Sequence, residues 1–305
     1  MRFEPMLQNK LAVALGFFDG VHLGHAALLE RVKTRAEEQG AEPAVLSFDV
    51  HPDTLVFGKD MSLINSAAER EAIIRRCFGI ERTILLHFNR ELMQMSWETF
   101  ISSAVEEMHI TSVVVGHDFS FGYRGEGTPD RLRNWCSGHG LSCDVIPAVR
   151  LDGRIISSTE IRHLLMDGRI EEANRLLGHP HCLSDVIRSG YHLGTRLGSP
   201  TINMVFPHDV IVPRHGVYAT RVILDDGSEH PAVTNVGVRP TVSETERVSV
   251  ESHLLDFEGD LYRHRARVDF YHFQRPERRF DTEQALAEQI RVDTENTRTW
   301  FCNNF

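Results

Sequence analysis

The stretch at residues 16–25, GFFDGVHLGH, constrains this chain more than any other. It follows an apolar run at residues 11–15 and precedes residues 26–32, whose apolar positions have helical spacing. This order predicts a strand, a glycine turn and a helix. Such a junction directs backbone N–H groups and the positive end of the helix dipole at one point, which favours binding of a phosphate.

The glycines and histidines of this stretch fit that interpretation. Gly16 and Gly20 can take positive φ, and Gly24 lets a ligand approach the backbone closely. His22 and His25 are three residues apart at the helix start and share one face. Two imidazoles beside a helix N-terminus suit a triphosphate whose α-phosphate gains charge during attack. An ordinary turn followed by surface histidines is the alternative for these residues taken singly.

Composition limits the class of protein. The 305 residues, 41% hydrophobic and 25% charged, are enough for two domains. A formal net charge of −10 argues against extended nucleic-acid binding, which needs a basic face. No apolar run is long enough to span a bilayer, and the N-terminus lacks the layout of a signal peptide.

The cysteines and a histidine run bear on compartment and metal binding. Five scattered cysteines without a CxxC pair indicate a reducing cytoplasm rather than a disulfide framework or a zinc site. The run His179-Pro180-His181-Cys182 has two ligand types, but nothing nearby supplies a third or fourth ligand. We therefore expect no metal site there.

Strands and helices alternate through the first half of the chain. Alternation of this kind predicts an α/β domain with a parallel sheet covered on both faces. The expected strands are residues 11–15, 42–49, 82–88, 110–115 and 142–149, and the expected helices are 26–32, 67–78, 96–107, 130–138 and 170–177.

Two polar segments of this half are further candidates for ligand contacts. Asp118 and Phe121 lie in a glycine- and aromatic-rich loop after a strand, which suggests a loop over a planar ligand, although such aromatics can equally fill the core. Ser158, Thr159 and Arg162 begin a helix. Their hydroxyls and guanidinium can hold phosphate oxygens, or Ser158 can be only a helix cap.

From about residue 181 the pattern changes to short segments with many turn residues. Residues 217–224 and 230–236 flank Asp225-Asp226-Gly227, a hairpin signal. Residues 248–255 and 266–273 alternate apolar and polar side chains, and residues 282–301 have helical spacing. This half therefore predicts a compact β-barrel with a C-terminal helix.

Two features of the second half can carry chemistry. A glycine-rich loop at residues 190–198 precedes Thr201 and Asn203. Loop N–H groups can cradle phosphates while these two side chains help to hold Mg²⁺. Glu251 is a lone acid in an otherwise neutral strand. It can act as general base beside ATP and a hydroxyl substrate, or simply face outward.

The form GxFDGxHxGH resembles the signature of the bacterial bifunctional riboflavin kinase/FAD synthetase family. The resemblance extends in order over residues 48–52, 116–122, 156–162, 200–203, 235–241, 251–257 and 275–280, and so covers essentially the whole chain. It implies a Rossmann-like nucleotidyltransferase domain at residues 1–180 and a six-stranded antiparallel barrel with a terminal helix at residues 181–305.

The resemblance also implies the reactions. The second domain would phosphorylate riboflavin to FMN with ATP, and the first would adenylylate FMN to FAD with release of pyrophosphate. ATP and Mg²⁺ would be required, riboflavin and FMN would be small-molecule substrates, and no nucleic acid or membrane would take part. The oligomeric state stays unknown.

Residue roles follow from the matching motifs. His22 and His25 would bind the ATP phosphates and stabilise the transition state. Glu251 would take the proton from the terminal ribityl hydroxyl, and Thr201 and Asn203 would position Mg²⁺. Nucleotide or flavin contacts would come from Gly16, Phe18, Asp19, Gly20, Gly24, Asp118, Phe121, Ser158, Thr159 and Arg162 in the first domain, and from Gly194, Arg196, Gly198, Pro200, Asn235, Arg275 and Glu277 in the second.

One motif departs from the family pattern. The usual GRxLGFPTAN reads GTRLGSPTIN at residues 194–203, so that Thr195 replaces an arginine, Ser199 an aromatic and Ile202 a small alanine. These changes can weaken ATP binding. A monofunctional FAD synthetase with a degenerate, flavin-binding kinase domain is therefore the main alternative. A regulator without turnover, or a cytidylyltransferase, explains fewer of the motifs.

Overall fold

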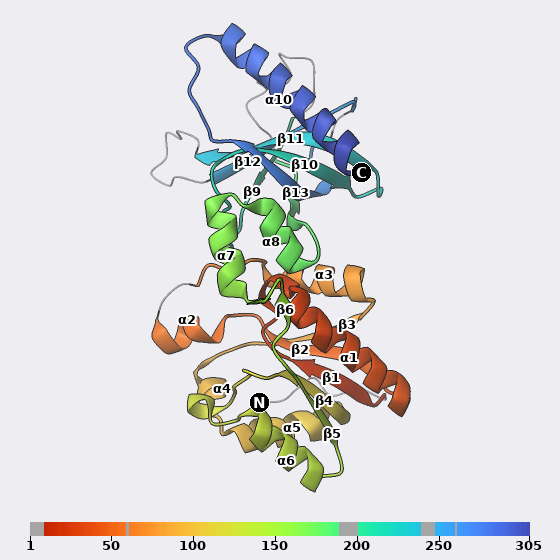
Figure 1. The fold of residues 1–305 in the computed structure, drawn as a ribbon. Helices are drawn as coiled ribbons and strands as arrows, with labels where there is room; N and C mark the ends of the chain where they lie inside the picture. The colour runs from red at the N-terminus through yellow and green to blue at the C-terminus, as the bar shows by residue number, and fades with distance from the viewer. Residues whose placement is uncertain (1–8, 59–60, 189–200, 239–247, 260) are drawn as a thin grey trace. The chain divides into compact units, whose positions relative to one another are not determined.

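The structure is a computed structural model that describes residues 9–58, 61–188, 201–238, 248–259 and 261–305 (Figure 1). The chain divides into two compact units, residues 1–158 and 159–305. The predicted fold class is confirmed in both halves. The functional boundary expected at residue 180 stays a prediction, because the helices at residues 158–177 group with the second unit.

A five-stranded parallel sheet in the order β3-β2-β1-β4-β5 forms the first unit. Its central strand β1 is buried along its whole length, as expected for a strand covered on both faces. The strand order reverses between β1 and β4, and ligands of such sheets bind at the carboxyl ends of the strands beside this reversal. The strands are β1 (Leu11–Leu15), β2 (Glu42–Phe48), β3 (Arg82–Leu86), β4 (Ile110–Gly116) and β5 (Ser142–Ile146).

Helices cover both faces of this sheet. In Figure 1, α1 and α3 lie on one face, and α5 and α6 lie on the other. Leu11, Val13 and Leu15 pack into one core cluster with side chains of α5 and α6. The short helices α2 and α4 and the small hairpin β6–β7 were not predicted. The elements are α1 (Leu23–Gln39), α2 (Pro52–Phe57), α3 (Ala67–Phe78), α4 (Arg90–Gln94), α5 (Trp97–Met108), α6 (Pro129–Gly138), β6 (Arg150–Leu151) and β7 (Arg154–Ile155).

The second unit is a six-stranded antiparallel sheet in the order β8-β13-β10-β11-β12-β9. The sheet curls so that its two edges meet. Just after edge strand β8, the N–H of Arg188 donates to the carbonyl of Asn203 on the other edge strand, β9, at 2.9 Å. The two edge strands were not predicted as strands. The elements are α7 (Ser158–Asp167), α8 (Ile170–Leu177), β8 (His181–Val186), β9 (Thr201–Val205), β10 (Gly216–Leu224), β11 (Glu229–Val238), β12 (Val248–Leu254), β13 (Arg265–Arg275) and α10 (Glu283–Asn304).

An ion pair attaches the terminal helix α10 to the sheet. The guanidinium of Arg275, at the end of β13, donates to the carboxylate of Asp293 on α10, with Nη2 2.6 Å and Nε 3.0 Å from its oxygens. Asp293 is buried, so this bidentate pair is shielded from solvent.

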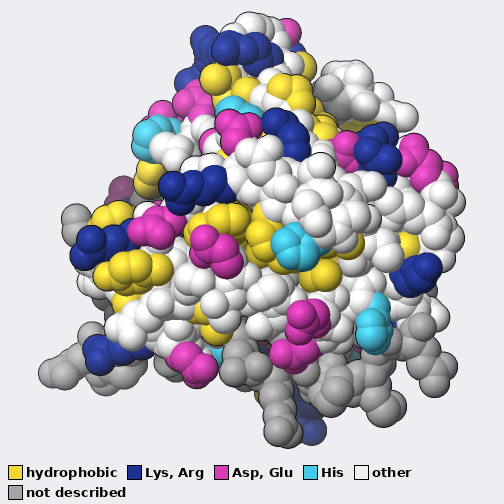
Figure 2. All heavy atoms as spheres, turned by 90° about the horizontal axis from the view of Figure 1, so that it is seen from below, with side chains coloured by type: hydrophobic (Ala, Val, Ile, Leu, Met, Phe, Trp, Pro, Cys, Tyr) yellow, Lys and Arg dark blue, Asp and Glu magenta, His cyan; other side chains and the backbone are white. Residues whose placement is uncertain are grey.

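Three observations bear on the function classes set out above. Acidic and basic side chains are interspersed on the face seen in Figure 2, and the described side chains form no continuous basic surface there. No described helix is both long and apolar enough to cross a bilayer. All five cysteines are free thiols.

Candidate active sites

The signature turn follows the carboxyl end of β1, at the strand reversal. Its backbone is unusual, because Phe18 (φ +60°), Gly20 (φ +80°) and Val21 (φ +44°) are all left-handed. A positive φ at a β-branched residue such as Val21 is a genuine outlier. Conformations of this kind cost roughly 1–3 kcal/mol each, and they persist only where the surrounding structure holds them.

Asp19 anchors the turn from two sides. Its carboxylate Oδ1 accepts the N–H of Ile64 at 2.8 Å and that of Asn65 at 3.4 Å. Its main-chain carbonyl accepts the hydroxyl of Ser158 at 2.9 Å. Asp19 and Ser158, both expected to bind nucleotide, therefore also fix the shape of the turn.

The two histidines lie together at the start of α1. His22 is the N-cap of the helix, and its Nδ1 accepts the N–H of His25 at 3.3 Å. The neutral His22 ring therefore carries its proton on Nε2, where it can donate to a ligand. The two rings stack, with centroids 3.7 Å apart and planes 11° from parallel. Burial, together with the nearby His22 and Arg70, holds the pKa of His25 well below its usual value.

The glycines of the signature make room for side chains. A Cβ on Gly24 would lie 2.9 Å from Cε1 of His22, so the glycine accommodates the His22 ring. A Cβ on Gly16 would lie 3.2 Å from the ring of Phe18. Of the two glycines expected to use positive φ, only Gly20 does so.

The other candidates of the first half are placed as follows. Asp118 follows β4 at the same edge of the sheet, and its side chain is 82% exposed. Phe121 is buried against Trp97 and Phe100, so it fills the core, as the alternative interpretation held. Thr159 and Arg162 belong to α7 and the second unit, and their phosphate contacts stay a prediction.

In the second unit, three candidates lie side by side on adjacent strands. Glu251 of β12 stands directly opposite Asn203 of β9 and opposite Asn235 of β11. Residues in register on antiparallel strands direct their side chains to the same face. Ser249, two residues before Glu251, places its Oγ 3.5 Å from Glu251 Oε1. This face thus gathers two carboxamides, a carboxylate and a hydroxyl.

Ile202 points away from this polar face. Thr201 and Asn203, on either side of it in β9, share the face of Glu251, whereas Ile202 is opposite Ser252 and only 1% exposed. The bulky residue that departs from the family pattern therefore packs in the core of the sheet. Its side chain does not crowd Thr201 or Asn203.

Glu277 joins the same group through Asn235. The Nδ2 of Asn235 donates to Glu277 Oε1 at 3.1 Å. The Glu277 carboxylate lies so close over Gly237 that a Cβ at that position would overlap it. By contrast, Arg275 has its guanidinium on Asp293, and its predicted contact with a ligand stays a prediction. Gly194, Arg196, Gly198 and Pro200 lie outside the described residues.

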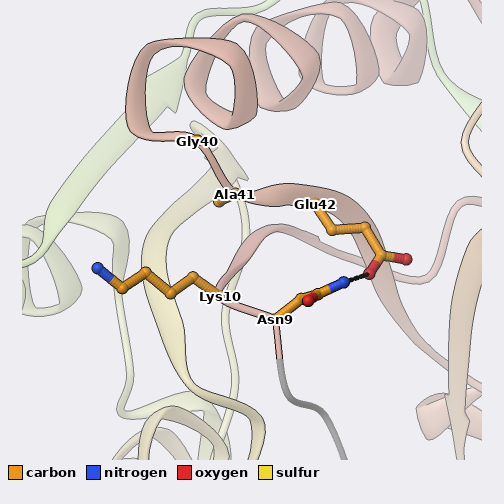
Figure 3. Close-up of a pocket in the computed structure, with 5 residues that line it drawn as sticks. All are labelled: Asn9, Lys10, Gly40, Ala41 and Glu42. Carbon is orange, nitrogen blue, oxygen red and sulfur yellow. Dashed lines mark hydrogen bonds between the residues drawn. The ribbon is translucent and has the colours of Figure 1, made fainter.

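A surface hollow of about 450 Å³ lies at the opposite end of the parallel sheet from the signature turn (Figure 3). It is lined by residues that precede or begin β1 and β2, and one hydrogen bond crosses it, from Asn9 Nδ2 to Glu42 Oε2 at 3.4 Å. Ligands of parallel sheets bind at the carboxyl ends of the strands, so we assign no ligand to this amino-terminal hollow. Its lining residues are Asn9, Lys10, Gly40, Ala41 and Glu42.

The geometry defines the class of protein. A helix start with two stacked histidines, placed at the strand reversal of a parallel sheet, has the features of a site that binds the phosphates of a nucleotide. It is followed by an antiparallel barrel whose polar face carries a carboxylate between two carboxamides.

Comparison with known proteins identifies the family. The family model described as FAD synthetase matches residues 4–160, and the one described as riboflavin kinase matches residues 177–301. Three curated relatives are named bifunctional riboflavin kinase/FMN adenylyltransferase. The one from Listeria monocytogenes is 32% identical over 96% of this chain and 93% of its own length. The one from Pseudomonas fluorescens is 36% identical over 93% and 91%, and the one from Bacillus subtilis is 33% identical over 97% and 94%.

This chain belongs to the bifunctional riboflavin kinase/FMN adenylyltransferase family. The resemblance inferred from the motifs is confirmed. A crystal structure titled "Macrolide-efflux Protein from Streptococcus pneumoniae" shares the fold, with a TM-score of 0.85 at 27% identity over 97% of this chain and 96% of that one. That title describes the other protein, and the likeness in fold is what the two chains share.

Proposed function

We propose that this chain makes FMN from riboflavin and ATP in its second unit, and FAD from FMN and ATP in its first. The observation that carries the proposal is that each matched half keeps its polar side chains assembled. His22 and His25 stack at the helix start, and Glu251 stands in register between Asn203 and Asn235.

In the first unit, a phosphate oxygen of FMN attacks the α-phosphorus of ATP, and pyrophosphate leaves. Negative charge grows on the oxygens of the α-phosphate during this step. His22 Nε2–H and the neutral His25 ring donate hydrogen bonds to these oxygens, and the N-terminus of α1 adds its positive dipole. No histidine has to form a covalent bond.

In the second unit, the terminal ribityl hydroxyl of riboflavin attacks the γ-phosphorus of ATP. Glu251 accepts the proton of that hydroxyl as the new O–P bond forms, which is the role a general base has in kinases. Asn203 and Asn235, on either side of Glu251, orient polar groups of the substrates.

The donor set of β9 fits Mg²⁺. The hydroxyl of Thr201 and the carboxamide oxygen of Asn203 are hard oxygen ligands on one face of the strand. Mg²⁺ usually takes few protein ligands and completes its shell with phosphates and water. No group of three His, Cys, Asp or Glu side chains forms an all-protein site among the described residues. Bound Mg²⁺ would supply positive charge to the ATP phosphates.

A product assay on the purified full-length chain tests the proposal. Riboflavin is supplied to one sample and FMN to the other, each with ATP and Mg²⁺, and the flavins are separated by chromatography. We expect FMN and FAD from riboflavin, and FAD from FMN. If only the sample with FMN yields FAD, the result would favour a monofunctional FAD synthetase with a degenerate kinase domain. No product in either sample would contradict the proposal.

The packing of Ile202 in the core favours an intact kinase over that alternative. A cytoplasmic location is part of the proposal, and the five free thiols support it, because a reducing compartment keeps cysteines unpaired.

A further inference from the structure

We infer that Arg70 is a positioning residue for adenylyl transfer, whose buried guanidinium holds the strained signature turn in the shape that aims His22 and His25 at the phosphates. The inference rests on the function proposed for the first unit, and it adds a residue that no motif of the family resemblance included.

Arg70 is an unusually buried arginine. It projects from the first turn of α3 and is only 2% exposed, so its charge lies inside the domain. Main-chain carbonyl oxygens accept hydrogen bonds from the buried guanidinium. Nη2 donates to the carbonyl of Phe48 at 2.7 Å, and Nη1 donates to that of Phe17. Nη1 also lies 3.2 Å from the hydroxyl oxygen of Ser47.

These contacts join two strand ends. Phe17 begins the signature turn after β1, whereas Ser47 and Phe48 end β2. Ser47 adds a further link between the two strand ends, because its hydroxyl donates to the same Phe17 carbonyl at 3.0 Å. The guanidinium also lies over the Phe17 ring, with Cζ 4.0 Å from the centroid, a cation–π contact. One planar, five-donor group makes all of these contacts at once, which a lysine ammonium cannot do.

The turn needs such support because its backbone is strained. Phe18 and Val21 have positive φ, and the residue before them, Phe17, is the one whose carbonyl Arg70 holds. Residues 64 and 65, just before α3, hold the Asp19 carboxylate with their N–H groups. The segment at residues 64–70 therefore holds the turn at two points, one on each side of Phe18.

Arg70 also acts on His25 through its charge. With burial and with His22, it holds the pKa of His25 well below its usual value. A positive charge near His25 favours the neutral ring, which can still donate an N–H to a phosphate oxygen. Geometry and charge thus assign Arg70 to the same site.

The test compares three variants of the full-length chain. Arg70→Lys keeps the charge but loses the planar fork, and Arg70→Met loses both. Arg76→Met is the matched control, because Arg76 lies on the exposed side of the same helix. The values of kcat and KM are measured separately for FAD formation from FMN and for FMN formation from riboflavin, and circular dichroism checks the fold.

We expect kcat for FAD formation to fall about 10- to 100-fold in Arg70→Lys, as for a misplacement of catalytic groups by about 1 Å, and further in Arg70→Met. KM for ATP and FMN stays within about 3-fold, because the turn acts on the transition state rather than on ground-state binding. FMN formation stays unchanged in all variants, and Arg76→Met behaves as wild type.

Each other outcome has a defined meaning. An unchanged kcat for FAD formation in folded Arg70→Met overturns the inference, and so does a rise in KM with retained kcat. If Arg70→Met does not fold, the kcat of Arg70→Lys decides. A wild-type chain that makes no FAD would instead contradict the proposed function, and the inference would fall with it.

Discussion

The imidazole rings of His22 and His25 stack at a centroid distance of 3.7 Å in the first turn of α1. Two protonated rings at this distance repel each other, and the pKa of His25 is already lowered by burial, His22 and Arg70. The free protein therefore disfavours a pair in which both rings are charged. Its N–H groups, rather than two full charges, are what the site offers to phosphate oxygens.

Replacing either histidine should abolish FAD formation selectively. His22→Ala or His25→Ala removes a donor aimed at the developing charge, and we expect kcat for FAD formation from FMN to fall about 100-fold or more. FMN formation from riboflavin should be unchanged, since it uses the second unit. Chromatography of the products of both reactions measures the two effects in one chain. His139→Ala, an exposed histidine of the same unit, is the control, and wild-type FAD formation in His22→Ala and His25→Ala would contradict the assignment.

The converse is expected for the barrel. Glu251→Gln keeps the size of the side chain but removes the base, so FMN formation should fall about 100-fold or more while FAD formation from added FMN is retained. Initial rates with each flavin measure this. Glu258→Gln changes an exposed carboxylate near the end of β12 and should leave both rates unchanged. Retained kinase turnover in Glu251→Gln would remove Glu251 as the base.

Local sequence patterns predicted most of the fold. The apolar run at residues 11–15, the glycine turn and the helix after it are encoded by neighbouring residues, and all three form as predicted. The edge strands β8 and β9 were missed, because each is only five or six residues long and lies in a stretch with many turn residues.

The pairing register of the strands in the second unit could not be predicted from the sequence. Asn203, Asn235 and Glu251 were singled out separately, but their alignment across β9, β11 and β12 depends on pairing between segments far apart in the chain. Ile202 illustrates the difference, since its identity suggested a crowded Mg²⁺ site, whereas its register places it in the core.

Arg70 was missed although a signal existed. It lies three and four residues before Ile73 and Ile74, and so on the same apolar face of α3. An arginine on such a face indicates a buried charge that needs partners. Its partners are carbonyls of two distant strand ends, which a reading of local pattern does not reveal.

Gly24→Ala should separate activity from stability. The new Cβ would lie 2.9 Å from His22 Cε1 and must displace the ring from its stacked position. Alanine is the better helix former by about 1 kcal/mol, so we expect little loss of thermal stability. We expect kcat for FAD formation to fall about 10-fold or more. Gly138→Ala is the matched control, since its Cβ would meet nothing within 4 Å. Equal FAD formation in the two variants would contradict the role given to Gly24.

Burial of His181 should make the second unit sensitive to acid. The ring lies in β8 beside Phe206 and Phe270, and neither of its nitrogens has a hydrogen-bond partner among the described residues. Burial, reinforced by His179, lowers the pKa of His181 to about 3. The unfolded chain, with an ordinary histidine pKa near 6.5, therefore binds the proton more readily than the folded chain between these two values.

The contribution of neutral His181 to the free energy of unfolding is fully present above about pH 6.5. Below that pH, the free energy of unfolding declines by about 1.4 kcal/mol for each pH unit. His181→Phe keeps an aromatic ring in the cluster but cannot take up a proton. Urea unfolding followed by circular dichroism at pH 6.5 and about pH 4.5 should show wild type losing about 2–3 kcal/mol more than His181→Phe. Parallel pH dependences in the two proteins would mean that His181 is protonated as easily in the folded barrel as in the unfolded chain.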